Sequence, residues 1–296
     1  MPNFNLQYFN QRLSNTLIGT ILLILTYLFF SVMELTAKEL ALRFNPFLIV
    51  FARYLSQLIL LLIIFNKQFK THLKSNHKPL QILRGALLMI TTCFMFTGLA
   101  YLQFAENISI YMIGPVITTI LAILILKEKI SFTQILLVII GLIGALIIAS
   151  PNKGAFNYAV IYPFLAALCF AFFTISTKFL NTSDSNQTTL LFTAITGTIL
   201  SLPFIIYFWK WPNLYDTLLM FCLGFLATAG HFLFIEALKV INASFAAPFV
   251  YLTVLLAAFW GYVLYNEVPS QNTFIGAFLI ITSGFIITRF KKKKFK

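Results

Sequence analysis

Ionisable side chains occur inside apolar stretches of this chain, where a charged group is costly to bury. A charge near the centre of a lipid bilayer costs roughly 2.5–3.5 kcal/mol. One stripe has residues spaced four, three and four apart, hence on one helix face: Tyr27, Ser31, Glu34 and Lys38. The stripe predicts either a polar cavity or a Glu34–Lys38 pair near the membrane surface, with the Lys38 ammonium reaching water.

The next apolar stretch carries Arg53 and Gln57, which are four residues apart and share a helix face. Two roles for the Arg53 guanidinium are open. It would either neutralise Glu34 or hold the carboxylate of a bound solute, for which its planar fork of donors is suited.

Three further candidates come from later apolar segments. His231 is either a hydrogen-bonded core residue or a binding group. Tyr111 and Tyr251 occupy nearly equivalent places in the two halves of the chain. They serve either packing or the recognition of a planar or cationic solute. The predicted solute-binding residues, which we expect to converge on a central cavity with Lys38 at its edge, are Tyr27, Glu34, Lys38, Arg53, Gln57, Tyr111, His231 and Tyr251.

The composition indicates a membrane protein that positions these residues on helices. Of the 296 residues, 60% are hydrophobic and 10% charged, whereas soluble domains carry about 25% charged residues. Helices are the open-ended way to satisfy backbone groups in lipid, and each span needs ~20 residues. The predicted spans lie at 17–33, 47–65, 81–102, 108–126, 131–149, 158–180, 188–208, 215–237, 243–264 and 271–289.

The chain repeats itself at an offset of 139 to 140 residues. At 139, Gly85 falls under Gly224 and Glu128 under Glu267; at 140, Lys38 falls under Lys178. We expect two halves, 1–150 and 151–296, of five spans each. Because five is odd, the second half enters the membrane from the opposite side. The predicted fold is therefore an all-α integral membrane protein of ten helices in two inverted repeats, the geometry of alternating access.

The basic residues predict the orientation. Of 21 Lys and Arg, sixteen fall on the side of the N-terminus, four on the other side, and Arg53 within a span. The positive-inside rule places both termini in the cytosol of a multi-pass protein of the cytoplasmic (inner) membrane. The net charge of +13 thus reports orientation, and no nucleic-acid partner is expected. The basic tail at Lys291–Lys294 is expected to touch anionic lipid.

Short motifs recur along nearly the whole chain in a fixed order. They are Lys38, Phe51–Arg53, Leu83–Gly85, Gly114–Val116, Glu128, Ala247–Tyr251, Asn266–Pro269 and Ile275–Ala277. In this order they resemble the EamA-type ten-helix carriers of the drug/metabolite transporter superfamily. The resemblance implies a secondary transporter that moves a small organic metabolite by alternating access. Leu83–Leu99 and Ala247–Tyr251 look like the S-adenosylmethionine uptake carriers of that family, or an amino-acid-type carrier.

The resemblance also implies a coupling ion. Smaller relatives of this superfamily depend on a membrane-embedded acid for proton coupling, and Glu34 beside Arg53 is similar to it. Protons are thus the expected coupling ion. Separately, Glu128 and Glu267 precede helices, where carboxylates favour the exposed amides of a helix N-terminus. The residues interpreted as capping or gate residues are Glu128, Glu267, Pro115 and Pro248.

Rival functions lack their sequence features. A membrane-embedded enzyme needs a nucleophile with a base, or a metal site, and no such motif occurs. Cys93, Cys169 and Cys222 lie in apolar spans without ligand spacing, so no metal or cofactor is expected. A channel and a scaffold remain as alternatives. An inverted repeat whose polar residues differ between the halves favours a carrier over a channel, and a scaffold has little need of Glu34 and Arg53 in lipid.

Overall fold

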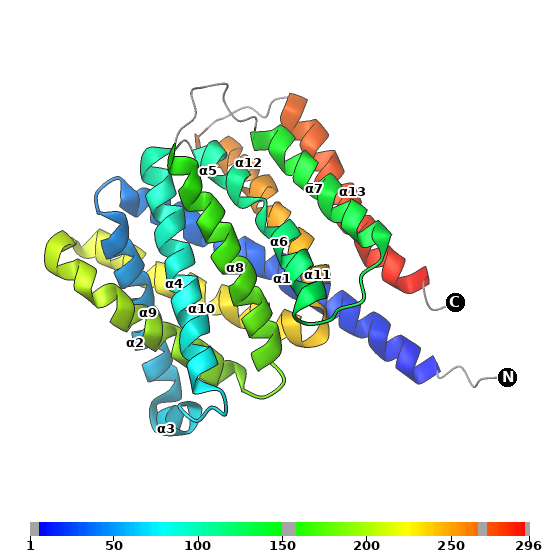
Figure 1. The fold of residues 1–296 in the computed structure, drawn as a ribbon. Coiled ribbons are helices and arrows are strands. Elements are labelled where there is room, and N and C mark those ends of the chain that lie inside the picture. The colour runs from blue at the N-terminus through cyan, green and yellow to red at the C-terminus, as the bar shows by residue number, and fades with distance from the viewer. Residues whose placement is uncertain (1–5, 103, 150–157, 266–270, 294–296) are drawn as a thin grey trace.

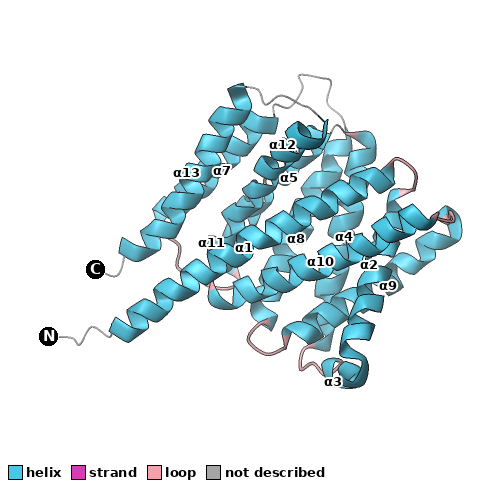
Figure 2. Ribbon diagram, turned by 180° about the vertical axis from the view of Figure 1, so that it is seen from behind, coloured by secondary structure: helices cyan, strands magenta, loops and turns pink. Residues whose placement is uncertain are grey.

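Every regular element in the described part of the chain is a helix (Figures 1 and 2). The computed structural model describes residues 6–102, 104–149, 158–265 and 271–293. The unbroken long helices are α1 (Leu6–Ala41), α2 (Pro46–Phe65), α4 (Lys78–Tyr101), α7 (Phe132–Ala149), α8 (Ile161–Leu180), α9 (Asn186–Phe208), α10 (Leu214–Val240) and α13 (Gln271–Lys293). Between α2 and α4 lie a short 3-10 turn, η1 (Asn66–Gln68), and α3 (Phe69–His72).

Two of the expected spans are broken, and they are the fourth span of each half. In the first half, α5 (Phe104–Tyr111) is followed by α6 (Gly114–Leu124). In the second half, α11 (Ala243–Ala246) leads through a 3-10 stretch, η3 (Ala247–Tyr251), into α12 (Leu252–Tyr265). These breaks correct the expectation of continuous helices at 108–126 and 243–264.

Proline accounts for the position of both breaks. Pro115 lies in the first turn of α6 and Pro248 in the first turn of η3. Proline lacks a backbone donor and disrupts a helix interior, but it is favoured in a first turn. The two prolines do not align at the repeat offset, yet each breaks the same span of its half.

All ten expected spans correspond to apolar helices. Among the described residues, seven helices are long and apolar enough to cross a membrane, and three shorter apolar helices lie at Gly114–Leu124, Phe132–Ile147 and Phe274–Ser283. The short ones belong to the expected fourth, fifth and tenth spans. The prediction of an all-helical membrane fold is thus confirmed.

Helix packing follows the repeat. The first span, α1, packs against the eighth, α10, and the sixth span, α8, packs against the third, α4. Spans 1 and 6 occupy the same place in the two halves, and so do spans 3 and 8, so the two contacts are equivalent. Likewise α2 packs on α9, and α7 on α13. The paired helices α7 and α13 run in opposite directions, and the two marked chain ends lie on the same side of the molecule (Figure 1). This is the arrangement of inverted repeats.

Close helix crossings hold the two halves together. Figure 2 shows α1 beside α10, which also packs against α2. At Gly224 of α10, an added Cβ would lie 2.4 Å from Ser56 Cβ and 2.7 Å from the backbone nitrogen of Gln57. The absence of a side chain at Gly224 therefore lets the two backbones approach.

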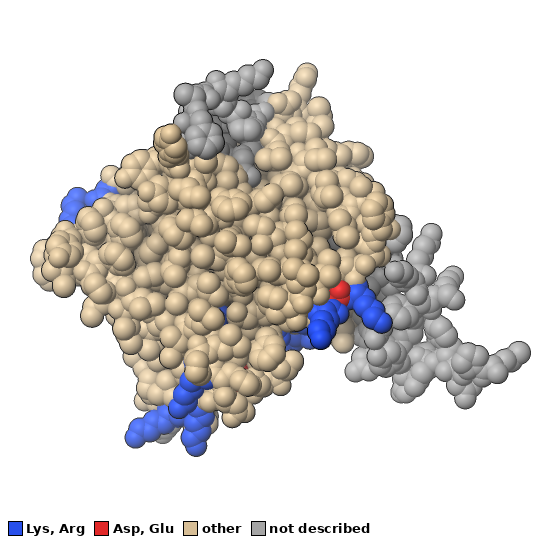
Figure 3. Space-filling model, viewed as in Figure 1, with Lys and Arg blue, Asp and Glu red and all other residues tan. Residues whose placement is uncertain are grey.

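The outer surface suits lipid. On the face shown in Figure 3, lysine and arginine side chains gather toward the edges and leave a broad area without charged side chains between them. Large apolar side chains such as Ile199, Leu202 and Phe225 are exposed on the outside of the bundle. A soluble protein would rarely expose such an extended apolar surface.

Candidate functional site

A cavity lies inside the bundle, between helices of both halves. Its walls come from α1, α2, α4, α5, α8, α10, η3 and α12: Tyr27, Phe30, Met33, Glu34, Arg53, Leu88, Thr91, Thr92, Met95, Phe96, Ile108, Tyr111, Phe170, His231, Val250 and Thr253. Its volume is about 90 Å³, whereas ligand pockets usually hold ~300–1,000 Å³. The helices must therefore separate before a metabolite of ordinary size can enter.

Five of the eight predicted binding residues line this cavity. They come from helices far apart in the chain: Tyr27, Glu34, Arg53, Tyr111 and His231. Because α1, α2 and α5 belong to the first half and α10 to the second, both repeats contribute polar groups to the cavity.

The other three predicted residues lie elsewhere. Lys38 is in the last turn of α1, one turn beyond Glu34, and is not part of the wall. Gln57 is fully buried near the crossing of α2 and α10, and neither its amide nitrogen nor its oxygen has a hydrogen-bond partner among the described residues.

Tyr251 is turned away from the cavity. Its hydroxyl donates to the carbonyl oxygen of Val138 in α7, at 3.1 Å. The physical reason is the 3-10 stretch η3, which has about three residues per turn instead of 3.6. Its neighbours Val250 and Thr253 line the cavity instead.

Glu34 is the carboxylate of the cavity, and it has no hydrogen bond or ion pair in the described part of the chain. The ion pairs found there join Arg43 to Glu39 and Asp216, and Lys239 to Glu236. No ion pair joins Glu34 to Lys38 or Arg53 among those found in the described residues. The Glu34–Lys38 pair at the membrane surface stays a prediction.

Arg53 is held by neutral groups. Its side chain is buried, and Nη1 donates to the Thr92 hydroxyl oxygen at 2.5 Å. Nη2 lies 2.9 Å from His231 Nε2, and the guanidinium carbon lies 4.9 Å from the centre of the Tyr54 ring. Among the described residues, Nε has no partner. No carboxylate in the described part of the chain forms an ion pair with the Arg53 guanidinium.

The contact with Arg53 fixes the role of His231. Arginine only donates hydrogen bonds, so His231 Nε2 accepts, and the neutral ring carries its proton on Nδ1. The ring is packed against Phe30, with centroids 4.8 Å apart, and Phe173, at 5.7 Å. His231 Nδ1 is buried and has no partner in the described residues.

Aromatic rings close the rest of the cavity. Tyr111 lies against Phe170, with ring centroids 6.0 Å apart, and Tyr27 meets Phe30 edge-on at 6.0 Å. No hydrogen bond of the Tyr27 or Tyr111 hydroxyl occurs within the described residues. The site therefore combines ring faces with hydroxyls that are free to bind a solute.

The sequence analysis missed two groups. Thr92 binds Arg53, and its own hydroxyl donates to the Leu88 carbonyl at 2.9 Å. Arg84, which lies in the motif Leu83–Gly85 and was not among the predicted binding residues, is fully buried. It donates to the hydroxyls of Thr177 and Thr193 at 2.7 and 2.5 Å. The signal for both was a polar residue within an apolar helix.

Glu128 caps a helix of the other half. Its carboxylate accepts from the backbone nitrogens of Ala243, at 3.0 Å, and Ser244, at 3.1 Å, and from the Ser244 hydroxyl. It thus caps α11, whereas we expected it to cap the helix that follows it in sequence. That helix, α7, is capped by Ser131 and Gln134, whose side chains bond reciprocally to each other's backbone nitrogens. Glu267 lies outside the described residues.

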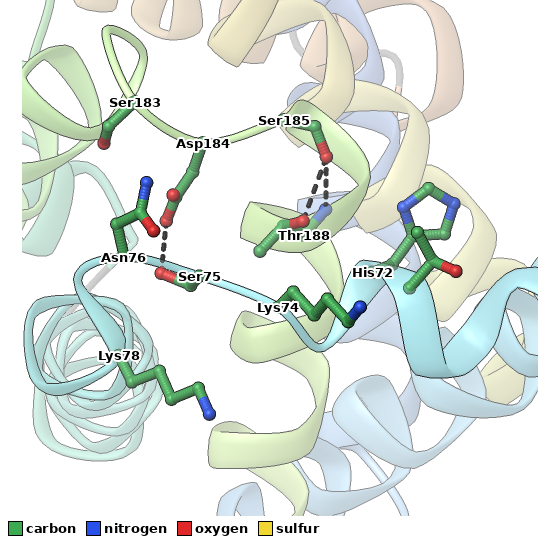
Figure 4. A pocket seen from close by; sticks show the side chains of 10 residues that line it. His72, Lys74, Ser75, Asn76, Lys78, Ser183, Asp184, Ser185 and Thr188 are labelled. Atoms are coloured by element: carbon green, nitrogen blue, oxygen red, sulfur yellow. Dashed lines mark hydrogen bonds between the residues drawn. The ribbon is translucent and has the colours of Figure 1, made fainter.

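A second, wider pocket lies where the α3–α4 connection meets the α8–α9 connection (Figure 4). It has a volume of about 540 Å³ and polar walls that include Lys74 and Lys78. Ser75 donates to the Asp184 carboxylate across it at 2.5 Å. This pocket lies between a loop of the first half and a loop of the second half. No group of His, Cys, Asp and Glu suited to a metal ion is found in the described chain.

Three known proteins are similar to this chain. A 30% identical protein of Rickettsia bellii, an S-adenosylmethionine uptake transporter, matches over 96% of this chain and 98% of its own length. A riboflavin transporter of Vibrio cholerae is 29% identical over 72% of each chain. A protein of known crystal structure has the same fold, with a TM-score of 0.78 at 16% identity, over 95% of this chain and 98% of the other.

The family to which the chain is similar also reflects its internal repeat. The family model of the EamA-like transporter family matches the chain twice, over residues 17–150 and 157–289. The two matches start 140 residues apart, in agreement with the repeat offset in the sequence. The chain belongs to the EamA-like transporter family.

Proposed function

We propose that this protein is a secondary transporter that moves a small organic metabolite across the cytoplasmic membrane by alternating access. The observation that carries the proposal is the cavity between the two repeats. It is lined by Glu34, Tyr27, Tyr111 and His231, and the buried atoms His231 Nδ1 and Arg53 Nε have no hydrogen-bond partner in the described residues. Buried polar groups are normally hydrogen-bonded, so a cavity with such atoms in its wall is a place where a ligand belongs.

We propose S-adenosylmethionine, or another amino-acid-type solute, as the transported metabolite. Relatives over most of the chain are named for S-adenosylmethionine uptake, and the aromatic walls of the cavity suit a cationic or planar solute. Riboflavin is the second candidate, because a relative is named for it. A cavity carboxylate favours the cationic solute over the uncharged ring system of riboflavin.

The proposal includes coupling and orientation. Glu34 is the carboxyl group of the cavity wall and would bind a proton in one step of the transport cycle and be ionised when the solute binds, so that protons serve as the coupling ion. Both termini would lie in the cytosol, with the basic end of α13 touching anionic lipid. Halves of 1–150 and 151–296 would move against each other.

The test is uptake of radiolabelled S-adenosylmethionine by proteoliposomes that contain the purified protein. We expect saturable uptake that unlabelled S-adenosylmethionine inhibits and riboflavin does not. If labelled riboflavin is taken up in a saturable way and labelled S-adenosylmethionine is not, riboflavin would take the place of S-adenosylmethionine as the proposed solute. Absence of any uptake of either compound, with protein correctly inserted, would favour a scaffold.

A further inference from the structure

Two side chains of opposite charge, Glu34 and Arg53, line the cavity, and no ion pair between them is found in the described residues. A buried carboxylate and a buried guanidinium are each costly without a partner, and pairing them would reduce that cost. Glu34 and Arg53 nevertheless line the same cavity without forming an ion pair. Each charge thus remains available to a solute.

We propose that the cavity binds the zwitterionic head of an α-amino acid, with the solute ammonium at Glu34 and its carboxylate at Arg53. The inference deepens the proposed function and rests on it. It assigns a separate partner to each charge of the solute. It also assigns Thr92 and His231 as positioning residues that hold the Arg53 guanidinium.

The Glu34 end of the cavity is prepared for a cation. The carboxylate accepts no hydrogen bond from the described residues, although it is partly buried. A carboxylate is an acceptor only, so a solute ammonium with its three donors complements it. Nearby rings of Tyr27, Phe30 and Tyr111 line the same space and favour positive charge over their faces.

The Arg53 end is prepared for an anion. Thr92 and His231 each take one donor of the guanidinium, at 2.5 and 2.9 Å. Because both acceptors are uncharged, they orient Arg53 without neutralising it. Nε, which has no partner among the described residues, and the unused hydrogens of Nη1 and Nη2 can donate to a carboxylate.

The positioning residues are themselves fixed. The Thr92 hydroxyl donates to Leu88 at 2.9 Å, so its lone pair faces Arg53. The His231 ring is packed between Phe30 and Phe173. Arg53 comes from the first half and His231 from the second, so the grip on the solute carboxylate depends on the contact between the repeats.

The experiment measures the Kd of three compounds by calorimetry with the purified full chain. The compounds are S-adenosylmethionine, its decarboxylated form, and its 2-oxo form, which lacks the amino group. The variants are Glu34→Gln and Arg53→Gln, with Glu39→Gln as a control because Glu39 is paired with Arg43 outside the cavity. Thermal unfolding of each variant reports whether it folds.

We expect a matched pattern of losses. Arg53→Gln should weaken S-adenosylmethionine at least tenfold and leave the decarboxylated form unchanged. Glu34→Gln should weaken S-adenosylmethionine and the decarboxylated form, and leave the 2-oxo form unchanged. Glu39→Gln should change none of the three. If Arg53→Gln does not fold, Arg53→Lys keeps the charge and should lose part of the same selectivity.

The positioning role has its own readout. His231→Leu should weaken S-adenosylmethionine but not the decarboxylated form, and His231→Gln, which restores an acceptor, should recover most of the affinity. Equal losses for all three compounds in the Glu34 and Arg53 variants would overturn the charge assignment and leave the transport function standing. A wild-type chain that binds none of the three would also overturn the zwitterion site, while uptake of riboflavin would still support a carrier.

Discussion

Several buried polar atoms have no hydrogen-bond partner among the described residues, both in the cavity, at Arg53 Nε and His231 Nδ1, and outside it, at Gln57 and Gln81 Oε1. Buried threonines such as Thr26, Thr174 and Thr228 satisfy their hydroxyls with carbonyl oxygens of their own helices. Glu34 has no such partner. A structural role would require one, because an unsatisfied buried group costs about 1–3 kcal/mol or more.

Replacing Glu34 tests its role directly. Glu34→Gln removes a charge that no described residue neutralises, and Arg53 keeps its contacts with Thr92 and His231. We therefore expect an unfolding temperature equal to or above that of the wild type, together with loss of transport. Uptake and thermal unfolding are measured on the same preparation.

Glu39→Gln is the matched control, since it loses an exposed ion pair with Arg43, which is worth only about 0–1 kcal/mol. Its transport should be normal. Normal transport by Glu34→Gln over several pH values would remove Glu34 from the mechanism.

Some of these residues could be predicted from spacing alone. The seven-residue spacing of Tyr27 and Glu34 and the four-residue spacing of Arg53 and Gln57 identified one face on each of two helices, because α1 and α2 are regular helices. The contact of Thr92 with Arg53 could not be predicted from the sequence, since a threonine hydroxyl in a helix usually bonds the backbone carbonyl one turn earlier in the same helix. Tyr251 was misplaced because spacing cannot reveal a 3-10 stretch.

At the level of elements, the fourth span of each half is interrupted, between α5 and α6 and at η3. The end of α6 illustrates how the protein compensates. Lys127 has a positive φ of 52°, and the Glu128 nitrogen reaches back to the Ala122 carbonyl at 3.1 Å. This turn places the Glu128 carboxylate at the start of α11.

We expect Glu128→Ala to destabilise the protein by about 1–3 kcal/mol, because the amides of Ala243 and Ser244 lose their acceptor. Glu128→Gln keeps an acceptor and should lose less. Thermal unfolding measures both. Lys129→Gln changes an exposed neighbour and is the control. An unchanged unfolding temperature for Glu128→Ala would show that the cap contributes nothing.

The crossing of α2 and α10 gives a second prediction at this scale. In Gly224→Ala the new methyl group would meet Ser56 and the backbone of Gln57, and overpacking costs ~1–3 kcal/mol. Gly114→Ala is the matched control, because the nearest atom to its added carbon is 3.6 Å away. Thermal unfolding should separate the two variants. Equal stability would mean that the helices can move apart at no cost.

Most element positions followed from hydropathy to within a few residues, because a bilayer fixes the length of each apolar stretch. The exception is the first span, which was expected at 17–33, whereas α1 runs over Leu6–Ala41. The breaks did not follow from hydropathy, since Pro115 and Pro248 leave the apolar character of their spans unchanged. The partner of Glu128 could not be predicted either. It depends on a contact between Glu128 and Ala243, which belong to different halves and lie 115 residues apart in the sequence.

For the whole molecule, the inverted repeat predicts which side each loop faces. Lys74 and Lys210 are exposed and lie in connections at opposite ends of the bundle in the ten-span arrangement. In a variant without Cys93, Cys169 and Cys222, a membrane-impermeant maleimide applied from outside should label Lys210→Cys and spare Lys74→Cys. The reverse pattern would invert the orientation, and labelling of both would contradict the ten-span topology.

The central claim is that the two repeats move a solute bound in the cavity between them from one side of the membrane to the other. The most direct measurement is counterflow of radiolabelled S-adenosylmethionine in proteoliposomes. A carrier must return its binding site across the membrane, so vesicles preloaded with unlabelled S-adenosylmethionine should take up label faster than empty ones, and Glu34→Gln should abolish this acceleration. Uptake that rises linearly with concentration and is indifferent to preloading would contradict alternating access.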